Sequence, residues 1–290
     1  SDSEMWNNPY AIFANLTNTQ LEQLAQKAQH ITRQRFGNVM RFFIPLYLSN
    51  ECFNNCTYCG FSYDRDIDRK MSRTKDRPLA CGDMKNPKDA LWIASIFLIT
   101  GIFISFYALN WIVTLHLMLG AFTYMFVYTI WLKRRHWINI VIGGASGSFP
   151  VLAGAAASNP DAFMLPMLMA ITLFFWTPSH FWALAILIKE DYAQAGVPML
   201  PVVVGDQVCA RYMMINTILL FLASLMPYYF DLLGIMYFII TIIFGFYFIW
   251  LNYLLLINPE KTIAKKMFLF SMVYLGGIFI AVVLDRNFGI

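Results

Sequence analysis

Seven long apolar runs follow Ala90, and they limit what the chain can fold into. Each is close to the roughly 20 residues that a helix needs to cross the hydrocarbon core of a bilayer. The composition agrees, because 13% of the residues are charged and 59% are hydrophobic, against about 25% charged in an average soluble protein. The sequence therefore predicts an all-α membrane protein surrounded by a lipid bilayer. We expect spanning helices over 90–109, 111–132, 138–157, 163–188, 213–232, 235–257 and 268–284.

Basic residues predict how these helices are oriented. If the spans cross alternately, the segments 64–89, 133–137, 189–212 and 258–267 lie on one side of the membrane. These segments hold 16 of the 21 lysines and arginines, whereas the opposite loops hold none and Arg286 lies in the tail. Because positively charged loops face the cytoplasm, the C-terminus is expected on the non-cytoplasmic side.

The segments on the basic side also carry acidic residues with the spacing of a metal site. Asp64 and Asp68 are four residues apart and would share one face of a helix, where Mg2+ could be held together with the phosphates of a substrate. Asp191 is expected at the same membrane face. A solvated charge patch that attracts anionic lipid is the simpler alternative. Cationic side chains could bind the phosphates of such a substrate, a diphosphate for example. The candidates are Arg73 and Arg77, again four residues apart, with Lys133 and Arg134.

Four motifs in order carry a resemblance to a known family. They are YDRDIDRKMSRTKDRPL at Tyr63–Leu79, KRRHWINIVIGGASGSFP at Lys133–Pro150, WTPSHFWALA at Trp176–Ala185 and KEDYAQAGVPMLP at Lys189–Pro201. Residues from about 63 to 290 resemble the protoheme IX farnesyltransferases, or heme O synthases, which are intramembrane UbiA-type prenyltransferases.

This resemblance implies a helical bundle around a cavity that opens toward the cytoplasm. It implies that Mg2+ ionises farnesyl diphosphate, that the vinyl group of heme b attacks the allylic cation, and that water completes a hydroxyethylfarnesyl group. By position, Asp64, Asp68 and Asp191 would hold the Mg2+–diphosphate, and Arg73, Arg77 and Lys133 would neutralise the leaving group. A bacterial or mitochondrial inner membrane is implied, and no nucleic-acid partner is expected. The oligomeric state is not indicated.

The chain also departs from the family pattern. Family members resemble nine-helix bundles, whereas seven spans are predicted here and the N-terminal segment is expected to stand in place of the two helices before the first motif. Gly60 stands where the family has an asparagine. A non-catalytic membrane protein is therefore an alternative.

His180 is the histidine that falls well inside an apolar run. An ionisable group at membrane depth is a functional candidate, so His180 could act as a base, bind heme iron or hydrogen-bond a neighbouring helix. His116 and His136 are expected near the membrane interfaces. Gly143 and Gly147 have the spacing of small residues at a helix–helix contact.

Three cysteines with C-x3-C-x2-C spacing precede the acidic motif. Cys52, Cys56 and Cys59 suit a [4Fe–4S] cluster whose open iron could bind S-adenosylmethionine. Zinc, which normally takes a fourth ligand, and a redox pair are alternatives, whereas a cytoplasmic location argues against disulfides.

The segment around these cysteines predicts a separate N-terminal piece. The sequence predicts an amphipathic helix from near Leu21 and a short strand over Arg41–Leu48, so we expect a small α/β fragment. Residues about 21–62 resemble the N-terminal part of a radical-SAM tyrosine lyase (2-iminoacetate synthase), without the rest of its barrel. The expected organisation is a radical-SAM-like fragment over 1–62 and a transmembrane prenyltransferase domain over 63–290.

Overall fold

The computed structural model describes residues 65–82 and 87–288, all within one compact unit of the chain, Leu46–Ile290. The described part is helical and contains no strand. The expected α/β fragment lies outside the described residues. The elements are α3 (Arg65–Lys70), α4 (Pro78–Cys81), α5 (Pro87–Ala108), α6 (Trp111–Phe122), η2 (Thr123–Leu132), α7 (Asn139–Gly143), α8 (Ala145–Ser158), α9 (Met164–Leu187), α10 (Lys189–Ala195), α11 (Leu200–Val204), α12 (Asp206–Tyr229), α13 (Ile235–Ile257) and α14 (Lys261–Phe288).

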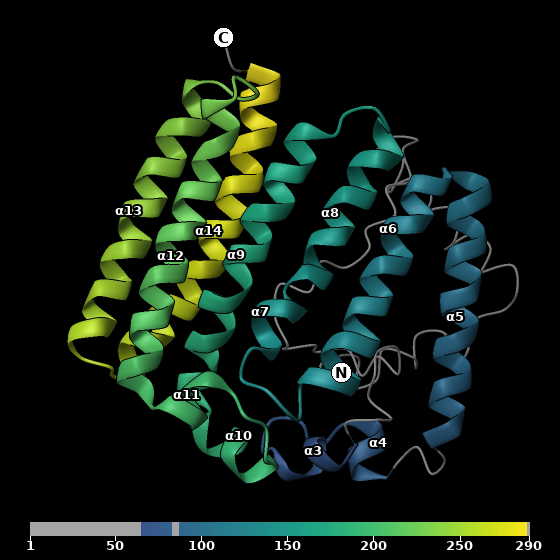
Figure 1. Ribbon diagram of the computed structural model, residues 1–290, viewed down its shortest axis with the longest axis vertical. Coiled ribbons are helices and arrows are strands. Elements are labelled where there is room, and N and C mark those ends of the chain that lie inside the picture. Colours follow the sequence, from purple (N-terminus) through teal and green to yellow (C-terminus); the bar gives the residue numbers. More distant parts are fainter. Residues whose placement is uncertain (1–64, 83–86, 289–290) are drawn as a thin grey trace, which may run out of the picture. The chain divides into compact units, whose positions relative to one another are not determined.

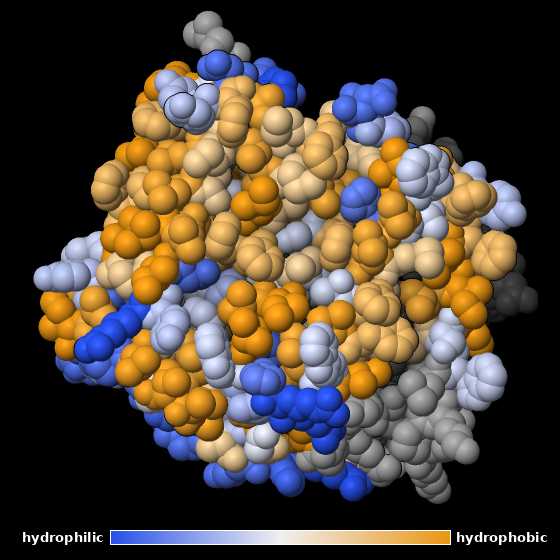
Figure 2. All heavy atoms as spheres, in the orientation of Figure 1, coloured by the Kyte–Doolittle hydropathy of each residue, from blue (hydrophilic) through white to orange (hydrophobic). Residues whose placement is uncertain are grey.

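Six helical stretches in the described part are long and apolar enough to cross a membrane. They are Trp111–Leu132, Asn139–Ser158, Met164–Leu187, Asp206–Tyr229, Ile235–Ile257 and Lys261–Asn287. The seventh expected span corresponds to α5, whose described apolar stretch, Trp92–Ala108, is shorter. Figure 2 shows hydrophobic side chains over the middle of the visible face and hydrophilic ones toward its two ends.

The helices form an open series in which each packs on the next. From one edge, α5 packs on α6, α6 on α8, and α8 on α9 (Figure 1). Helix α9 also contacts α12 and α14, and α13 packs against both of these. Within the described structure 67% of the apolar stretch of α9 is buried, against 17% of the stretch formed by α6 and η2. The tightly packed half of the bundle is therefore the group α9, α12, α13 and α14.

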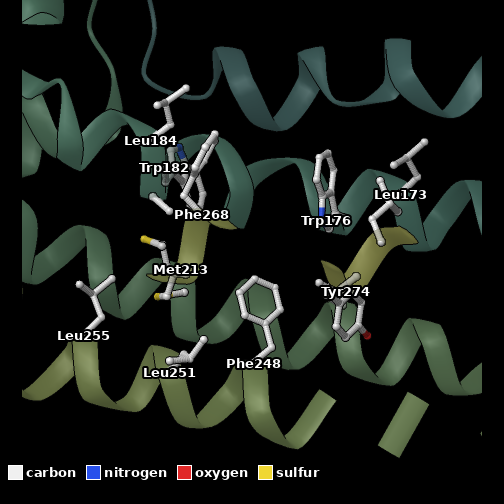
Figure 3. Packing of buried hydrophobic residues seen from close by; sticks show 14 of the residues in the cluster. Leu173, Trp176, Trp182, Leu184, Met213, Phe248, Leu251, Leu255, Phe268 and Tyr274 are labelled. Atoms are coloured by element: carbon white, nitrogen blue, oxygen red, sulfur yellow. The ribbon is translucent and has the colours of Figure 1, made fainter. Parts of the chain in front are cut away.

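Large side chains fill the core of that half. Trp176 and Leu173 of α9 lie opposite Tyr274 of α14, and Phe248 of α13 reaches the same layer (Figure 3). Lipid is as apolar as these side chains, so close packing and hydrogen bonds between helices provide the stability.

Polar contacts tie the four helices together. Ser179 of α9 lies 3.0 Å from the Thr217 hydroxyl of α12, which also accepts a 2.8 Å hydrogen bond from Asn252 of α13. Ser224 of α12 and Tyr274 of α14 are joined at 2.7 Å. Hydrogen bonds of this kind contribute about 0.6 kcal/mol each within a membrane.

Two helices begin earlier than the apolar runs predicted. α12 begins at Asp206 rather than at 213, and α14 begins at Lys261 rather than at 268. The first turns carry polar and charged residues, which can form a helix in water but are costly in hydrocarbon. An apolar run therefore marks the part of a helix within the membrane and not the whole helix.

The expected span 138–157 is interrupted where glycines allow close contacts. α7 ends at Gly143 and α8 begins at Ala145. A methyl group on Gly143 would lie 2.6 Å from the Tyr128 ring, and one on Gly144 would lie 3.0 Å from Thr177. Gly147, in contrast, has only Leu173 nearby, at 4.0 Å. The tightest approaches therefore occur at Gly143 and Gly144, whereas the structure leaves room for a methyl group at Gly147.

Candidate functional site

Asp68, in the first motif, is buried. Its carboxylate accepts hydrogen bonds from Arg77 Nη1 at 2.9 Å on Oδ1 and 3.1 Å on Oδ2. Burial raises the pKa of Asp68, while the nearby positive charges of Arg77 and Lys133 act in the opposite direction. The structure thus brings Asp68, Arg77 and Lys133 together, and the roles expected for them remain predictions.

The chain after α3 turns sharply. Residues 71–77 form turns and a bend instead of continuing the helix, so the expectation that the spacing of Arg73 and Arg77 places them on one helix face is wrong. Thr74 is buried, and its hydroxyl donates a 3.0 Å hydrogen bond to the Asp68 carbonyl. Arg77 is extended, with φ −67° and ψ 143°, because the following Pro78 disfavours helical backbone. This turn lets Arg77 fold back onto Asp68.

Asp191 lies in the first turn of α10, the short helix after α9. Its Oδ2 atom accepts a hydrogen bond from the Ser72 backbone N–H at 3.2 Å and another from the Ser72 hydroxyl. The two acidic segments are therefore in direct contact, and α3 packs against α10 (Figure 1).

Arg73 carries a positive charge next to this contact. Its Nε and Nη1 atoms are buried and have no hydrogen-bond partner among the described residues. Buried guanidinium nitrogens without hydrogen-bond partners are costly, and an anion bound beside them would remove that cost. Arg73 therefore fits a site for a phosphorylated ligand.

Tyr192 follows Asp191 and is buried. Burial raises the pKa of Tyr192 to about 12, with a further contribution from Tyr128 and an opposing one from Arg73, Lys133 and Arg77. The phenol is therefore neutral at physiological pH. Its electrostatic neighbours come from two other segments, the one with Tyr128 and Lys133 and the one with Arg73 and Arg77.

Lys133 and Arg134 occupy the turn after η2, where both are half-buried. The Lys133 ammonium lies 5.9 Å from the centre of the Tyr128 ring, within range of a cation–π contact. Buried Asn139 donates a long hydrogen bond, 3.4 Å, to the Lys133 carbonyl. The structure therefore places this basic turn beside the acidic segments.

His180 is fully buried in α9, away from the acidic turns in sequence. Its ring stacks between Trp176 and Phe268, with centroid distances of 4.3 Å and 4.7 Å. His180 Nδ1 lies 2.6 Å from the Ser271 hydroxyl, which donates its own proton to the Phe268 carbonyl at 2.6 Å. Because that hydroxyl has one proton, His180 Nδ1 must be the donor to it.

The other ring nitrogen of His180 is then an acceptor. Nε2 is buried and has no partner among the described residues. His116 and His136 lie elsewhere: His116 contacts the Ile112 carbonyl within its own helix at 2.8 Å, and His136 is exposed. The interfacial reading of these two histidines remains a prediction.

Part of the expected site lies outside the described residues. This applies to Asp64 and to the three cysteines Cys52, Cys56 and Cys59. Within residues 65–82 and 87–288, no three histidine, cysteine, aspartate or glutamate side chains are grouped as a metal site. The described donors for a cation are the carboxylates of Asp68 and Asp191.

These donors suit Mg2+, which is usually held by one or two carboxylates together with substrate phosphates. Both hydrogen bonds from Ser72 end on Asp191 Oδ2, so Oδ1 accepts none from the described residues. Asp68 and Asp191 can therefore each donate to a cation, and the buried nitrogens of Arg73 can donate to an anion.

Sequence reasoning missed Ser72 and Tyr192. Ser72 lies inside the quoted first motif and Tyr192 directly follows Asp191, yet neither forms a pattern that predicts a contact. The one sequence feature that could have pointed to either residue is its position close to an acidic residue of the predicted site.

The described part of the chain is thus a bundle of membrane helices in which two acidic segments meet beside half-buried cationic side chains. The chain belongs to the UbiA prenyltransferase family, whose model matches residues 52–274. The corresponding activity class, transfer of a prenyl group, applies to the family as a whole.

Relatives and solved structures agree with this assignment. Protoheme IX farnesyltransferase 1 of Paramagnetospirillum magneticum is 48% identical over 225 residues, covering 78% of this chain and 79% of the relative. The protoheme IX farnesyltransferase of Deinococcus radiodurans is 38% identical over 230 residues, covering 77% and 73%. None of these matches supports the radical-SAM reading of the N-terminal segment.

Two solved structures share the fold. A structure described as digeranylgeranylglyceryl phosphate synthase has a TM-score of 0.64, with 22% identity and 78% of each chain covered. A UbiA homologue from Archaeoglobus fulgidus bound to DMAPP and Mg2+ has a TM-score of 0.53, with 18% identity, covering 77% of this chain and 81% of the other.

Proposed function

We propose that this protein transfers the farnesyl group of farnesyl diphosphate to the vinyl group of heme b, giving heme O. The observation that carries the proposal is the 48% identity with a protoheme IX farnesyltransferase over 78% of the chain. Asp68, Arg73, Arg77, Lys133 and Asp191 all lie in segments that match the motifs of that family.

Asp68 and Asp191 would hold Mg2+, together with Asp64. The metal supplies charge neutralisation for the departing diphosphate. Support comes from the contact between the two acidic segments and from the A. fulgidus homologue, which was solved with DMAPP and Mg2+. Arg73, with two buried nitrogens free of partners among the described residues, would grip the diphosphate with Arg77, Lys133 and Arg134.

The reaction breaks the bond between the farnesyl C1 carbon and the diphosphate oxygen, and both electrons leave with the diphosphate. The terminal vinyl carbon of heme b forms the new carbon–carbon bond. A water oxygen then adds to the adjacent carbon and releases one proton. The side chains of Arg73 and Lys133 stabilise the negative charge of the leaving group, and His180 Nε2 is a candidate acceptor for the released proton.

The test is a product assay on the full chain in detergent. The protein is incubated with heme b, farnesyl diphosphate and Mg2+, and the hemes are identified by mass. Asp191→Asn should reduce heme O formation by about 100-fold or more, an effect typical of removing a key charge-stabilising group. The matched control is Asp161→Asn, an exposed aspartate between α8 and α9, which should retain full activity. The proposal fails if a nine-helix relative makes heme O under these conditions and this chain makes none.

The membrane topology is also proposed. α5 would form a seventh crossing, and the segments containing α3, Lys133 and α10 would face the cytoplasm, with the C-terminus on the other side. The distribution of basic residues supports this arrangement. A bacterial inner membrane, or the mitochondrial equivalent, is the proposed location. Labelling of single cysteines placed at positions 161 and 265 from each side of sealed vesicles distinguishes this topology from its reverse.

For the N-terminal segment we propose a separate piece over residues 1–62, joined to the prenyltransferase domain over 63–290. The spacing of Cys52, Cys56 and Cys59 supports a [4Fe–4S] cluster, with S-adenosylmethionine as its co-substrate. Iron and sulfide analysis of anaerobically purified protein tests this second function. About four irons per chain, lost in Cys56→Ala, would support it, and an iron-free protein would reject it.

A further inference from the structure

Ser72 is the residue through which the first acidic segment touches the second. Its backbone N–H lies 3.2 Å from Asp191 Oδ2, and its hydroxyl donates to the same oxygen. The two residues are 119 positions apart in the sequence, so this contact is a feature of the folded bundle and not of local structure.

The contact restricts the Asp191 side chain. Asp191 is half-buried at the start of a seven-residue helix, where its carboxylate could otherwise rotate freely. Hydrogen bonds to a charged carboxylate are about twice as strong as those between neutral groups. With Oδ2 held by two donors, Oδ1 keeps a fixed direction and accepts no hydrogen bond from the described residues.

Ser72 itself is held in place by its neighbours. Its side chain is exposed, but Met71 before it is 4% exposed and Thr74 after it is 3% exposed. Thr74 is anchored to the Asp68 carbonyl at 3.0 Å. The position of the Ser72 hydroxyl therefore follows from the same turn that brings Arg77 to Asp68.

We propose that Ser72 is a positioning residue, which orients the Asp191 carboxylate toward the cation and so couples the two acidic segments into one binding site. This inference rests on the proposed function, because it assumes that Asp191 binds the cation. Residues that orient a metal ligand typically change metal affinity about 10- to 100-fold when they are removed.

The variant Ser72→Ala removes the hydroxyl and keeps the backbone N–H. Its affinity for the cation should fall about tenfold, whereas Ser72→Thr, which retains a hydroxyl, should restore most of it. Ser158→Ala, at an exposed serine that ends α8, is the matched control and should bind like the parent. Because Ser72 is exposed, all three variants should melt within about two degrees of the parent.

The experiment measures Mn2+ binding by the full chain in detergent with electron paramagnetic resonance, with and without farnesyl diphosphate. The Mg2+ concentration for half-maximal heme O formation is measured in parallel. A tenfold weaker affinity in Ser72→Ala, with turnover near that of the parent at saturating Mg2+, supports the inference. Equal Mn2+ affinity in Ser72→Ala and parent, or a loss of turnover that extra Mg2+ does not restore, overturns it.

The binding measurement also separates this inference from the proposed function. A parent chain that binds no Mn2+ even with farnesyl diphosphate overturns the metal site and the inference together. A parent chain that binds Mn2+ and makes heme O, with an unaffected Ser72→Ala variant, overturns the role of Ser72 alone.

Discussion

The guanidinium of Arg77 holds both carboxylate oxygens of Asp68, at 2.9 Å and 3.1 Å. The Asp68 side chain is 6% exposed and that of Arg77 is 26% exposed. Because burial disfavours the Asp68 charge, this carboxylate depends on its cationic partner. Removal of one member of such a pair leaves a buried charge without compensation.

We therefore expect Arg77→Ala to destabilise the protein by about 2–3 kcal/mol, seen as a melting temperature several degrees lower in detergent. Asp68→Asn removes the charge that needs the arginine. The double variant should accordingly be more stable than the sum of the single effects predicts, with a coupling of about 1 kcal/mol or more. Strict additivity of the two changes would show that the pair is not energetically coupled.

Because Gly143 lies against Tyr128, we expect alanine at Gly143 to lower the stability of the protein far more than alanine at Gly154. A methyl group on Gly143 would lie 2.6 Å from the Tyr128 ring, whereas one on Gly154 would meet no atom within 4 Å. Gly143→Ala should cost about 1–3 kcal/mol through overpacking, and it should displace the ring beside Lys133. Gly154→Ala should be neutral or slightly stabilising, because alanine favours helix. The melting temperatures of the two variants are compared in detergent. Equal melting temperatures would contradict the close contact at Gly143.

The Asp285 side chain of α14 caps the N-terminus of α13. Its carboxylate, buried near the end of α14, accepts hydrogen bonds from the Gly234 N–H at 2.6 Å and the Tyr237 N–H at 3.1 Å. These donors belong to the start of α13, where backbone N–H groups lack partners within the helix. Asp285→Ala should destabilise the protein by about 1–2 kcal/mol without changing the Mg2+ requirement. Asn287→Ala is the control, since Asn287 is exposed and its amide bonds within its own helix. A control that melts as early as Asp285→Ala would exclude the cap as the cause.

His180 can be separated from its packing role by substitution with another ring. His180→Phe keeps an aromatic ring between Trp176 and Phe268 but removes the acceptor Nε2. If the acceptor serves the reaction, heme O formation should fall at least tenfold while the melting temperature stays within a few degrees. Ser271→Ala, which removes the partner of Nδ1 and leaves Nε2, should have the smaller effect on turnover. Full activity in His180→Phe would assign the histidine to helix packing alone.

The membrane helices were predictable because a long apolar run has few alternatives to a spanning helix. The run 235–257 coincides with α13, and 163–188 differs from α9 by one residue at each end. The polar first turns of α12 and α14 were not predictable in this way, since charged residues do not distinguish a helix outside the membrane from a loop.

The site was predicted less completely than the fold. Charge singled out Asp68 and Arg77 as candidates, but the spacing of Arg73 and Arg77 did not predict the turn that brings Arg77 to Asp68. The contact of Ser72 with Asp191 could not be foreseen, because it depends on how α3 and α10 meet in space. A serine in a loop has no charge and belongs to no periodic sequence pattern, so nothing in the sequence indicates such a contact.

The distance in sequence between Ser72 and Asp191 also affects how the protein is made. The ribosome releases the first acidic segment long before the second, and the membrane helices between them must be inserted before the two can touch. During that interval Asp68 can pair with Arg77, which lies nine residues away, whereas Asp191 and its serine partner are not yet joined. The Asp68 half of the site can therefore form early in synthesis, but the complete site must wait until α9 has crossed the bilayer and α10 has returned to the same face.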